Sequence, residues 1–319
     1  MANPAIPITE PGQAKTKSQR EQLVELASVA DLFHTPEGEG WASVPVKGHR
    51  ENWRIRRDGF KKWLRQRYWQ KHQKAPGTTA LQDAVEQLDA KAQFQGNSES
   101  VYLRIAGSGG NIYIDLANDQ WEVVEITPTG WRVISDPPVR FRRAPGMLEL
   151  PYPTGGGTVD VLRRYLNLDP HDEAAWVLVV TWLSASCRPT GPFPILILQG
   201  PQGSAKSTMV RVLRRLVDPS TAALRTVSRD ERDFQIAATN SWVVAVDNLS
   251  GIQPWFSDAL CRVATGGGSA SRTLYTDTDE TILDALAEPF FTFLRALQVD
   301  WGRRLHIAAP RLCTSRIYP

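Results

Sequence analysis

The stretch PFPILILQGPQGSAKSTMVRVLRRLV, residues 192–217, decides the fold. It begins with a short and almost continuous apolar segment (192–199), which is typical of a strand buried on both faces of a parallel sheet. A glycine-rich turn follows, and the apolar residues from Met209 to Val217 then keep helical spacing. Strand, glycine-rich turn, Lys-Ser and helix is the order that a phosphate-binding loop (P-loop) requires.

The residue types of this turn fit the chemistry of a nucleotide phosphate. Glycines let backbone N–H groups turn toward the phosphates, and the start of the helix supplies partial positive charge. Lys206 is expected to reach the β- and γ-phosphates and Ser207 to ligate Mg²⁺. The predicted ATP-binding residues are Gly200, Gln202, Gly203, Ser204, Ala205, Lys206, Ser207 and Thr208. The alternative is a glycine turn that precedes a helix by chance.

One position of the turn departs from the strict P-loop pattern. Ala205 stands where that pattern has its second glycine. We expect the methyl group to be tolerated, because φ is negative in the first turn of a helix.

A second apolar segment, Trp242 to Val246, ends in Asp247 and Asn248. A carboxylate at the carboxyl end of a strand beside the loop strand is the second group that organises magnesium in P-loop proteins. We therefore predict catalytic roles for Lys206, Asp247 and Asn248, with Ser207 and Asp247 as metal ligands. Asn248 can orient a water molecule but cannot accept its proton, so hydrolysis is expected to be impaired.

The rest of the chain indicates two domains. Residues 1–20 are rich in Pro, Lys and Thr and predict a disordered N-terminus. Residues 21–150 predict an α+β domain, with helical stripes in 18–33, 60–68 and 81–92 and a β-meander from Val101 to Ile134. The turn 151–157 marks a boundary, after which 151–283 predicts an α/β domain with a parallel sheet. A capped helix is expected from Ser228, another over 255–264, and a β-hairpin over 271–283.

Composition excludes several classes of protein. No apolar run approaches the ~20 residues that a membrane span needs, and residues 2–19 do not have the pattern of a signal peptide, so a cytoplasmic protein is expected. The three cysteines form no Cys-x-x-Cys pair, which excludes a disulfide framework and a zinc finger.

One segment is strongly basic. Lys47 to Lys74 holds eleven Lys and Arg residues against Glu51 and Asp58, interleaved with Trp53, Trp63, Tyr68 and Trp69. Clustered cations attract nucleic-acid phosphates, and exposed aromatic rings can stack on bases. We assign the tryptophans to the core, because Phe60, Trp63 and Leu64 share one stripe. The predicted DNA-contacting residues are Arg54, Arg56, Arg57, Lys61, Lys62 and Arg65; a solvated helix surface is the alternative.

The segments GPQGSAKST (200–208), VVAVDNLSGIQPWFSDALCRVATGGG (243–268) and SRTLYTDTDE (271–280) resemble ATP-binding proteins of prophages and integrative elements. Such proteins are primase-associated or helicase-like, and more broadly they resemble superfamily 3 helicases of the AAA+ group. The resemblance implies a P-loop (AAA+-like) parallel sheet after an α+β N-terminal domain. It further implies ATP and Mg²⁺ as cofactors, DNA and a primase or other replication protein as partners, a homo-oligomer, and a role in DNA replication.

Residues 284–319 depart from that resemblance. Such proteins continue after the hairpin with a strand ending in a sensor Asn and a later arginine finger, and neither can be assigned here. The tail is expected to be truncated or frameshifted, or to be a divergent but ordered end. If the tail is truncated or frameshifted, the sheet lacks a flanking strand, and little or no ATP hydrolysis is expected. The alternative functions are a nucleic-acid-binding protein with a vestigial ATP site and a small-molecule phosphotransferase.

Overall fold

The computed structural model describes residues 17–226, 230–249, 253–265, 269–272, 280–283, 292–298 and 304–308. From residue 269 onward it describes the backbone of strands. The chain divides into two compact units. The first contains the described residues up to 46 together with 52–99, and the second contains 47–51 and the described chain from residue 100. The units therefore divide at 99–100 and not at the expected boundary of 150–151.

In the first unit, helices cover a four-stranded sheet of order β3-β2-β1-β4. The helices are α1 (Gln19–Leu26), α2 (Asp58–His72) and α3 (Thr78–Gln95), with a 3-10 turn η1 (Ala27–Val29). The strands are β1 (Asp31–His34), β2 (Gly40–Val46), β3 (His49–Arg54) and β4 (Asn97–Ser98). The predicted apolar stripes of α2 and α3 form one buried core with residues of α1 and β2.

The start of the first unit differs from the expectation. The helix expected over 18–33 ends at Leu26, and Phe33 lies fully buried in β1, because pairing with β2 outweighs local helical spacing. Ser18 accepts a hydrogen bond from the Glu21 backbone and caps α1, so order begins inside the segment 1–20 that was expected to be disordered. Residues 1–16 of that segment lie outside the described residues.

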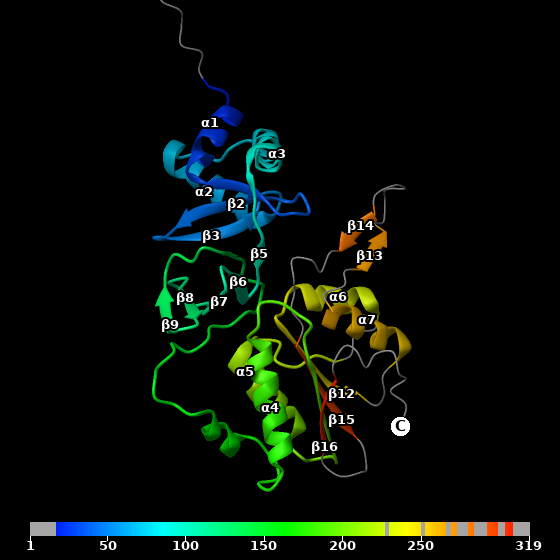
Figure 1. The fold of residues 1–319 in the computed structure, drawn as a ribbon. Helices are drawn as coiled ribbons and strands as arrows, with labels where there is room; N and C mark the ends of the chain where they lie inside the picture. Colours follow the sequence, from blue (N-terminus) through cyan, green and yellow to red (C-terminus); the bar gives the residue numbers. More distant parts are fainter. Residues whose placement is uncertain are drawn as a thin grey trace, which may run out of the picture. The chain divides into compact units, whose positions relative to one another are not determined.

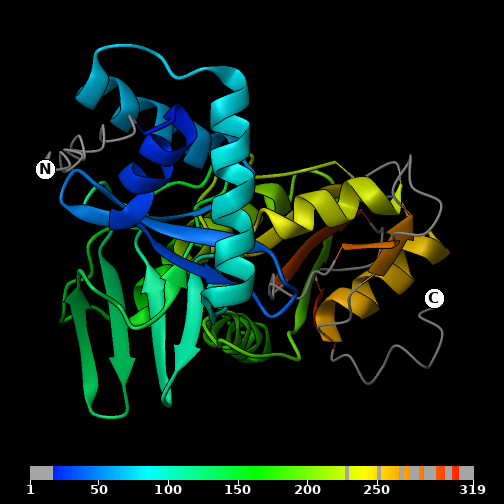
Figure 2. The same ribbon diagram turned by 90° about the horizontal axis from the view of Figure 1, so that it is seen from above.

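The second unit begins with the predicted meander. Its sheet has the order β6-β7-β8-β9, and the four strands lie side by side in Figure 2. The strands are β6 (Ile105–Ser108), β7 (Asn111–Asp115), β8 (Val123–Thr127) and β9 (Gly130–Ile134), and each pairs antiparallel with the next. Strand β5 (Val101–Tyr102) precedes this sheet in the sequence and β10 (Arg140–Phe141) follows it, and the two form a short parallel pair.

The loop strand β11 (Ile195–Gly200) lies in a second four-stranded sheet of order β12-β15-β11-β16. Strands β12 (Val243–Leu249), β15 (Thr292–Gln298) and β11 run parallel, and β16 (Arg304–Ala308) runs antiparallel to β11. Arg225 forms a single parallel bridge to Val246, on the side of β12 away from β15. The sheet is thus mostly parallel.

Side chains of β11 alternate between two cores, which explains its continuous apolar sequence. Leu196 and Leu198 pack with residues of α4 (Glu173–Ser186) and α5 (Lys206–Val217). Ile195 and Ile197 pack with residues of α6 (Glu231–Thr239) and α7 (Pro254–Thr265). Figure 1 shows the two helix pairs on opposite sides of the sheet. The result is a three-layer α/β/α arrangement.

The largest difference from the sequence-based expectation lies in residues 284–319. A truncated or frameshifted tail was expected to leave the sheet without a flanking strand, and this is wrong, because β15 and β16 both come from this region and pair with β11 on its two sides. The alternative of a divergent but ordered end agrees with this pairing. The predicted hairpin is confirmed, because β13 (Ser269–Arg272) pairs antiparallel with β14 (Glu280–Leu283). The predicted cap Ser228 lies outside the described residues, and Asp230 caps α6 instead by accepting from the Asp233 backbone at 2.8 Å.

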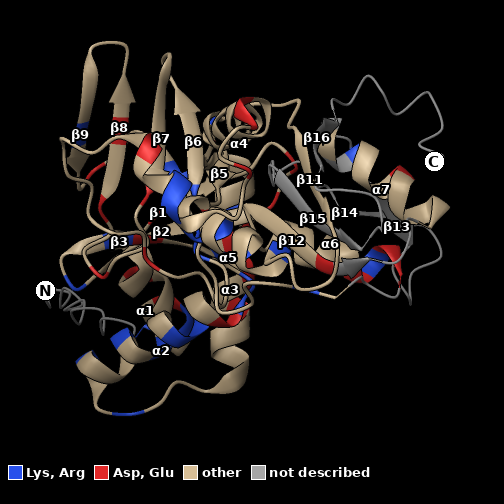
Figure 3. Cartoon of the chain, turned by 90° about the horizontal axis from the view of Figure 1, so that it is seen from below, with Lys and Arg blue, Asp and Glu red and all other residues tan. Residues whose placement is uncertain are grey.

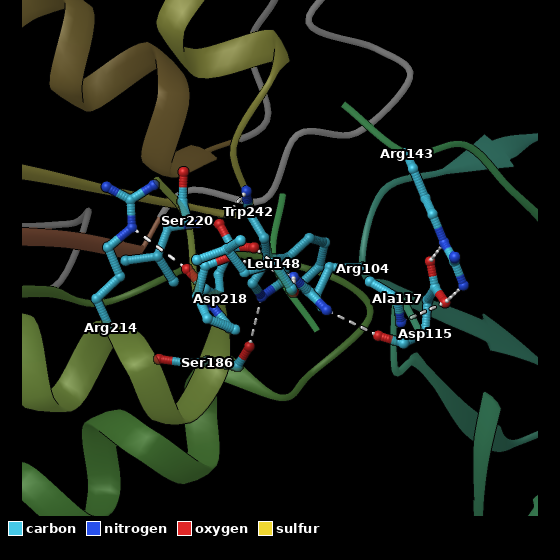
Figure 4. Close-up of polar contacts among 12 residues, drawn as sticks. Arg104, Asp115, Ala117, Arg143, Leu148, Ser186, Arg214, Asp218, Ser220 and Trp242 are labelled. Carbon is cyan, nitrogen blue, oxygen red and sulfur yellow. Dashed lines mark hydrogen bonds and ion pairs between the residues drawn. The ribbon is translucent and has the colours of Figure 1, made fainter. Parts of the chain in front are cut away.

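A buried polar network ties the meander to the end of α5 and the start of β12 (Figure 4). The Arg104 side chain is fully buried, and its Nε donates to the Asp218 carboxylate at 3.2 Å. The same guanidinium donates to the carbonyl oxygens of Asp115 at 3.0 Å and Leu148 at 2.7 Å. Burial lowers the pKa of Arg104, and the carboxylates of Asp218 and Asp115 oppose that shift.

Asp218 also connects the network to the start of β12, the strand that contains Asp247. It ends α5, and its second carboxylate oxygen accepts from the backbone N–H groups of Trp242 and Val243, at 2.9 and 3.0 Å. Val243 is the first residue of β12, and Trp242 directly precedes it. Asp115 in turn accepts from Arg143, whose guanidinium lies 3.8 Å from the centre of the Trp121 ring. The meander, the end of α5 and the start of β12 are therefore held by one set of charges, which explains why the units divide before the meander.

Replacing Arg104 by Met should lower the free energy of unfolding by about 3–5 kcal/mol, because it leaves the buried Asp218 carboxylate without its cation. Urea denaturation at pH 7 followed by tryptophan fluorescence measures the change. The control is Arg163→Met, which breaks an exposed bidentate pair with Glu173 and should cost no more than about 1 kcal/mol. Equal losses in the two variants would contradict the role given to Arg104.

Candidate nucleotide site

The loop between β11 and α5 carries the predicted nucleotide residues. Two of its residues have left-handed backbone, Gly203 at φ 78° and Ala205 at φ 58°. The expectation of a negative φ at Ala205 is therefore wrong. Ala205 precedes the first helical residue and is the N-cap of α5, which lies outside the helical part of the backbone. The missing second glycine thus places a methyl group where glycine is favoured.

Lys206 is the first residue of α5, and its ammonium group lies within the loop. The Nζ atom donates to the carbonyl oxygens of Gly200 at 2.8 Å and Pro201 at 2.7 Å, and to the Ser204 hydroxyl at 3.3 Å. Among the described residues, no carboxylate pairs with the Lys206 ammonium group, so its full charge faces the loop. Together with the start of α5 it makes the loop a site for an anion.

A cavity of about 710 Å³ opens beside this loop. Its lining includes Ser204, Lys206 and Met209 from the loop and α5, and Leu198 and Gln199 from β11. The remaining wall comes from the segment before α4 and its first turns, namely Asn167, Leu168, Asp169, Pro170, Asp172 and Ala175. Asn167 joins the two sides, because its amide donates to the Ser204 carbonyl at 3.2 Å. A cavity of this size and mixed character suits a small polar ligand.

Sequence reasoning missed the wall formed by residues 167–175. These residues contain no recognised motif, and they lie about thirty residues before the loop. Asp172 caps α4 by accepting a hydrogen bond from the Ala175 backbone at 2.9 Å. In the sequence it indicates only the start of a helix, not a binding site.

Asp247 and Asn248 lie in β12, whose carboxyl end shares an edge with that of β11 because both pair parallel with β15. The strand that contains Asp247 was expected next to the loop strand, but β15 lies between β12 and β11. In the register, Gly200 is paired with Gln298 at the end of β15, and Leu249 is paired with Leu297. The Asp247 backbone is fixed on its other side by a hydrogen bond to the Arg225 carbonyl at 3.0 Å. The Asn248 side chain lies outside the described atoms.

The predicted DNA-contacting residues fall in the first unit and divide into two groups. Arg54 pairs with Glu39 at 3.0 Å and Arg56 with Asp89 at 2.6 Å. With Arg57 these arginines and acids line a hollow of about 430 Å³, whose charges largely cancel. Lys62 and Arg65 are exposed on α2, and Lys61 is half-buried. The basic segment is therefore less cationic at its start than its sequence suggests.

Part of the second unit is similar to a known protein family. Residues 159–293, less than half of the chain, match a family described as the actinomycete integrative conjugative element replication protein. Among solved structures, the chain is similar to the apo structure of the NrS-1 C-terminal region. That similarity has 12% identity and a TM-score of 0.42, and it covers 89% of this chain and 58% of that one. No curated protein matches.

The family match supports a role in the replication of a mobile element, in agreement with the general form of the sequence-based expectation. Among the described residues, no helix is long and apolar enough to cross a bilayer.

Ala205→Gly should raise the free energy of unfolding by about 0.5–1 kcal/mol, because relief of left-handed strain exceeds the added freedom of the unfolded chain. Ala90→Gly, at an exposed position inside α3, is the matched control and should lower it by about 1 kcal/mol, since glycine is a poor helix residue. Thermal or urea denaturation measures both. The same sign of change in both variants would contradict the left-handed assignment.

Proposed function

We propose that this chain binds Mg²⁺-ATP at residues 200–208 and acts, as a P-loop protein of the AAA+ type, on DNA during replication of a mobile element. The observation that carries the proposal is the Lys206 ammonium group, held by loop carbonyls at the start of α5 and lining the cavity of about 710 Å³. A cation at a helix start beside a cavity is the arrangement that a polyphosphate needs.

The residues predicted to contact the phosphates and the metal ion have distinct roles in this proposal. Lys206 would leave the Gly200 and Pro201 carbonyls to meet the β- and γ-phosphates, while backbone N–H groups around Gly203 surround them. Ser207 and Asp247 are oxygen donors of the kind that Mg²⁺ prefers, and the ion would shield the phosphate charge when bound. The wall at Asn167 to Asp172 would then contact the base and sugar.

The topology supports the AAA+ form of the proposal. The resembled proteins continue after the hairpin with a sensor strand, and here β15 follows the hairpin β13–β14 and pairs with both β11 and β12. Its last residue, Gln298, is in register with Gly200 at the start of the loop. A polar residue thus stands at the end of this strand, although it is not the expected Asn.

Hydrolysis is proposed to be slow. The tail no longer supports this view, since β15 and β16 complete the sheet. The remaining reason is Asn248, which follows Asp247 and has no carboxylate to accept a proton from water. DNA, a primase and further copies of this chain remain proposed partners.

Lys206→Ala should weaken Mg²⁺-ATP binding by about 10- to 100-fold, because a charged hydrogen bond to phosphate contributes about 1.5–3 kcal/mol. Isothermal titration calorimetry with the full chain measures the affinity. Arg211→Ala, which removes an exposed cation from the same helix, serves as the control and should bind normally. Unchanged affinity in the Lys206 variant would overturn the loop assignment.

Asn248→Glu should raise the rate of ATP hydrolysis by at least about 10-fold, since a positioned base contributes about 10²–10⁴-fold to such reactions. Phosphate release with and without single-stranded DNA gives the rate. Asn240→Glu, at the exposed end of α6, is the control and should change nothing. Fast, DNA-stimulated turnover by the unmodified chain would show that Asn248 does not limit hydrolysis.

A further inference from the structure

Helix α2 has an exposed face that neither the core nor the nucleotide site uses. The helix contains five Lys and Arg residues and one carboxylate, Asp58, which lies in its first turn. Figure 3 shows the blue of these cations along α2. Phe60, Leu64 and Tyr68 bury the opposite side of the helix in the core of the first unit.

Trp69 lies on this exposed face. Its exposed fraction is 54%, whereas Trp63 of the same helix is 6% exposed. The assignment of all the tryptophans to the core is therefore wrong for Trp69. A single exposed apolar residue is common on protein surfaces, so Trp69 is informative only together with the cations that lie beside it.

Two exposed cations lie on the same stripe as Trp69. Arg65 and Lys62 precede it by one and two helical turns, so the three side chains follow one line of about 10 Å. Neither cation forms an ion pair with a carboxylate among the described residues, in contrast to Arg54 and Arg56. Asp58 stands at the far end of this line, one turn before Lys62.

We propose that this stripe binds single-stranded nucleic acid, with Lys62 and Arg65 on successive phosphates and the Trp69 indole stacked on an unpaired base. The inference rests on the proposed DNA-related function and names the form of DNA and the stacking residue. A duplex hides the faces of its bases, so only an unpaired base can stack on an indole. A membrane surface is a poorer fit, because the apolar side of α2 is already buried and Trp69 is the large apolar residue that the helix exposes.

The test is binding of a labelled oligothymidine and of a duplex of equal length to the full chain. Trp69→Ala should weaken single-strand binding by roughly 5- to 140-fold, the range that loss of one stacked base gives, and should affect duplex binding far less. Trp69→Phe should retain most of the affinity. Trp131→Ala is the matched control, since Trp131 is 49% exposed on β9 of the meander, and it should bind like the unmodified chain.

Salt dependence separates stacking from charge. The double variant Lys62→Gln, Arg65→Gln should reduce the slope of log K against log salt by about 1.4, at about 0.7 per phosphate contact on a single strand, while Trp69→Ala should leave the slope unchanged. Unchanged affinity in Trp69→Ala, or equal losses in Trp69→Ala and Trp131→Ala, would overturn this inference alone. Failure of the unmodified chain to bind any oligonucleotide would also overturn the proposed DNA role, whereas Mg²⁺-ATP binding is measured separately.

Discussion

The carboxylate of Asp218 joins three segments that are far apart in the sequence. One oxygen accepts from the buried Arg104 guanidinium, and the other accepts from the backbone at the start of β12. Asp218 itself ends α5, the helix that begins with Lys206. The ion pair therefore fixes one end of both elements that carry the candidate site, and an error in its geometry would be transmitted to the loop and to Asp247. Buried charges of this kind are costly to break, so they hold a single arrangement.

The loop was the part of the site that sequence could predict. Its motif is local, and strand, turn and helix follow one another within 26 residues, so periodicity and glycine spacing were sufficient. The backbone of Ala205 was not predictable in the same way, because the position of the helix start by one residue decides whether φ is negative or positive. The cavity wall at Asn167 was also missed, since its residues carry no motif and reach the loop through tertiary packing.

The other errors come from contacts between distant residues. Arg104 alternates in the sequence with the apolar residues Leu103 and Ile105, yet it is fully buried because Asp218, 114 residues later, supplies its charge partner. Trp63 and Trp69 are the same residue type in the same basic segment. Trp63 is buried and Trp69 is exposed because they lie on different sides of α2. The strands of the tail were missed because residues 292–298 lack a regular alternation, and pairing on both sides is what makes them a strand.

The position of β15 also constrains how this chain is made. Its two neighbours, β11 and β12, are synthesised first, and β15 enters between them only when residues 292–298 have left the ribosome. At about 5–20 residues per second, β11 waits for several seconds with an unpaired edge and apolar side chains that need a sheet around them. During that interval the half-finished sheet is a target for chaperones and for wrong pairing with other chains. The first unit lies wholly upstream and is free of this delay, so it can fold while the sheet is still incomplete.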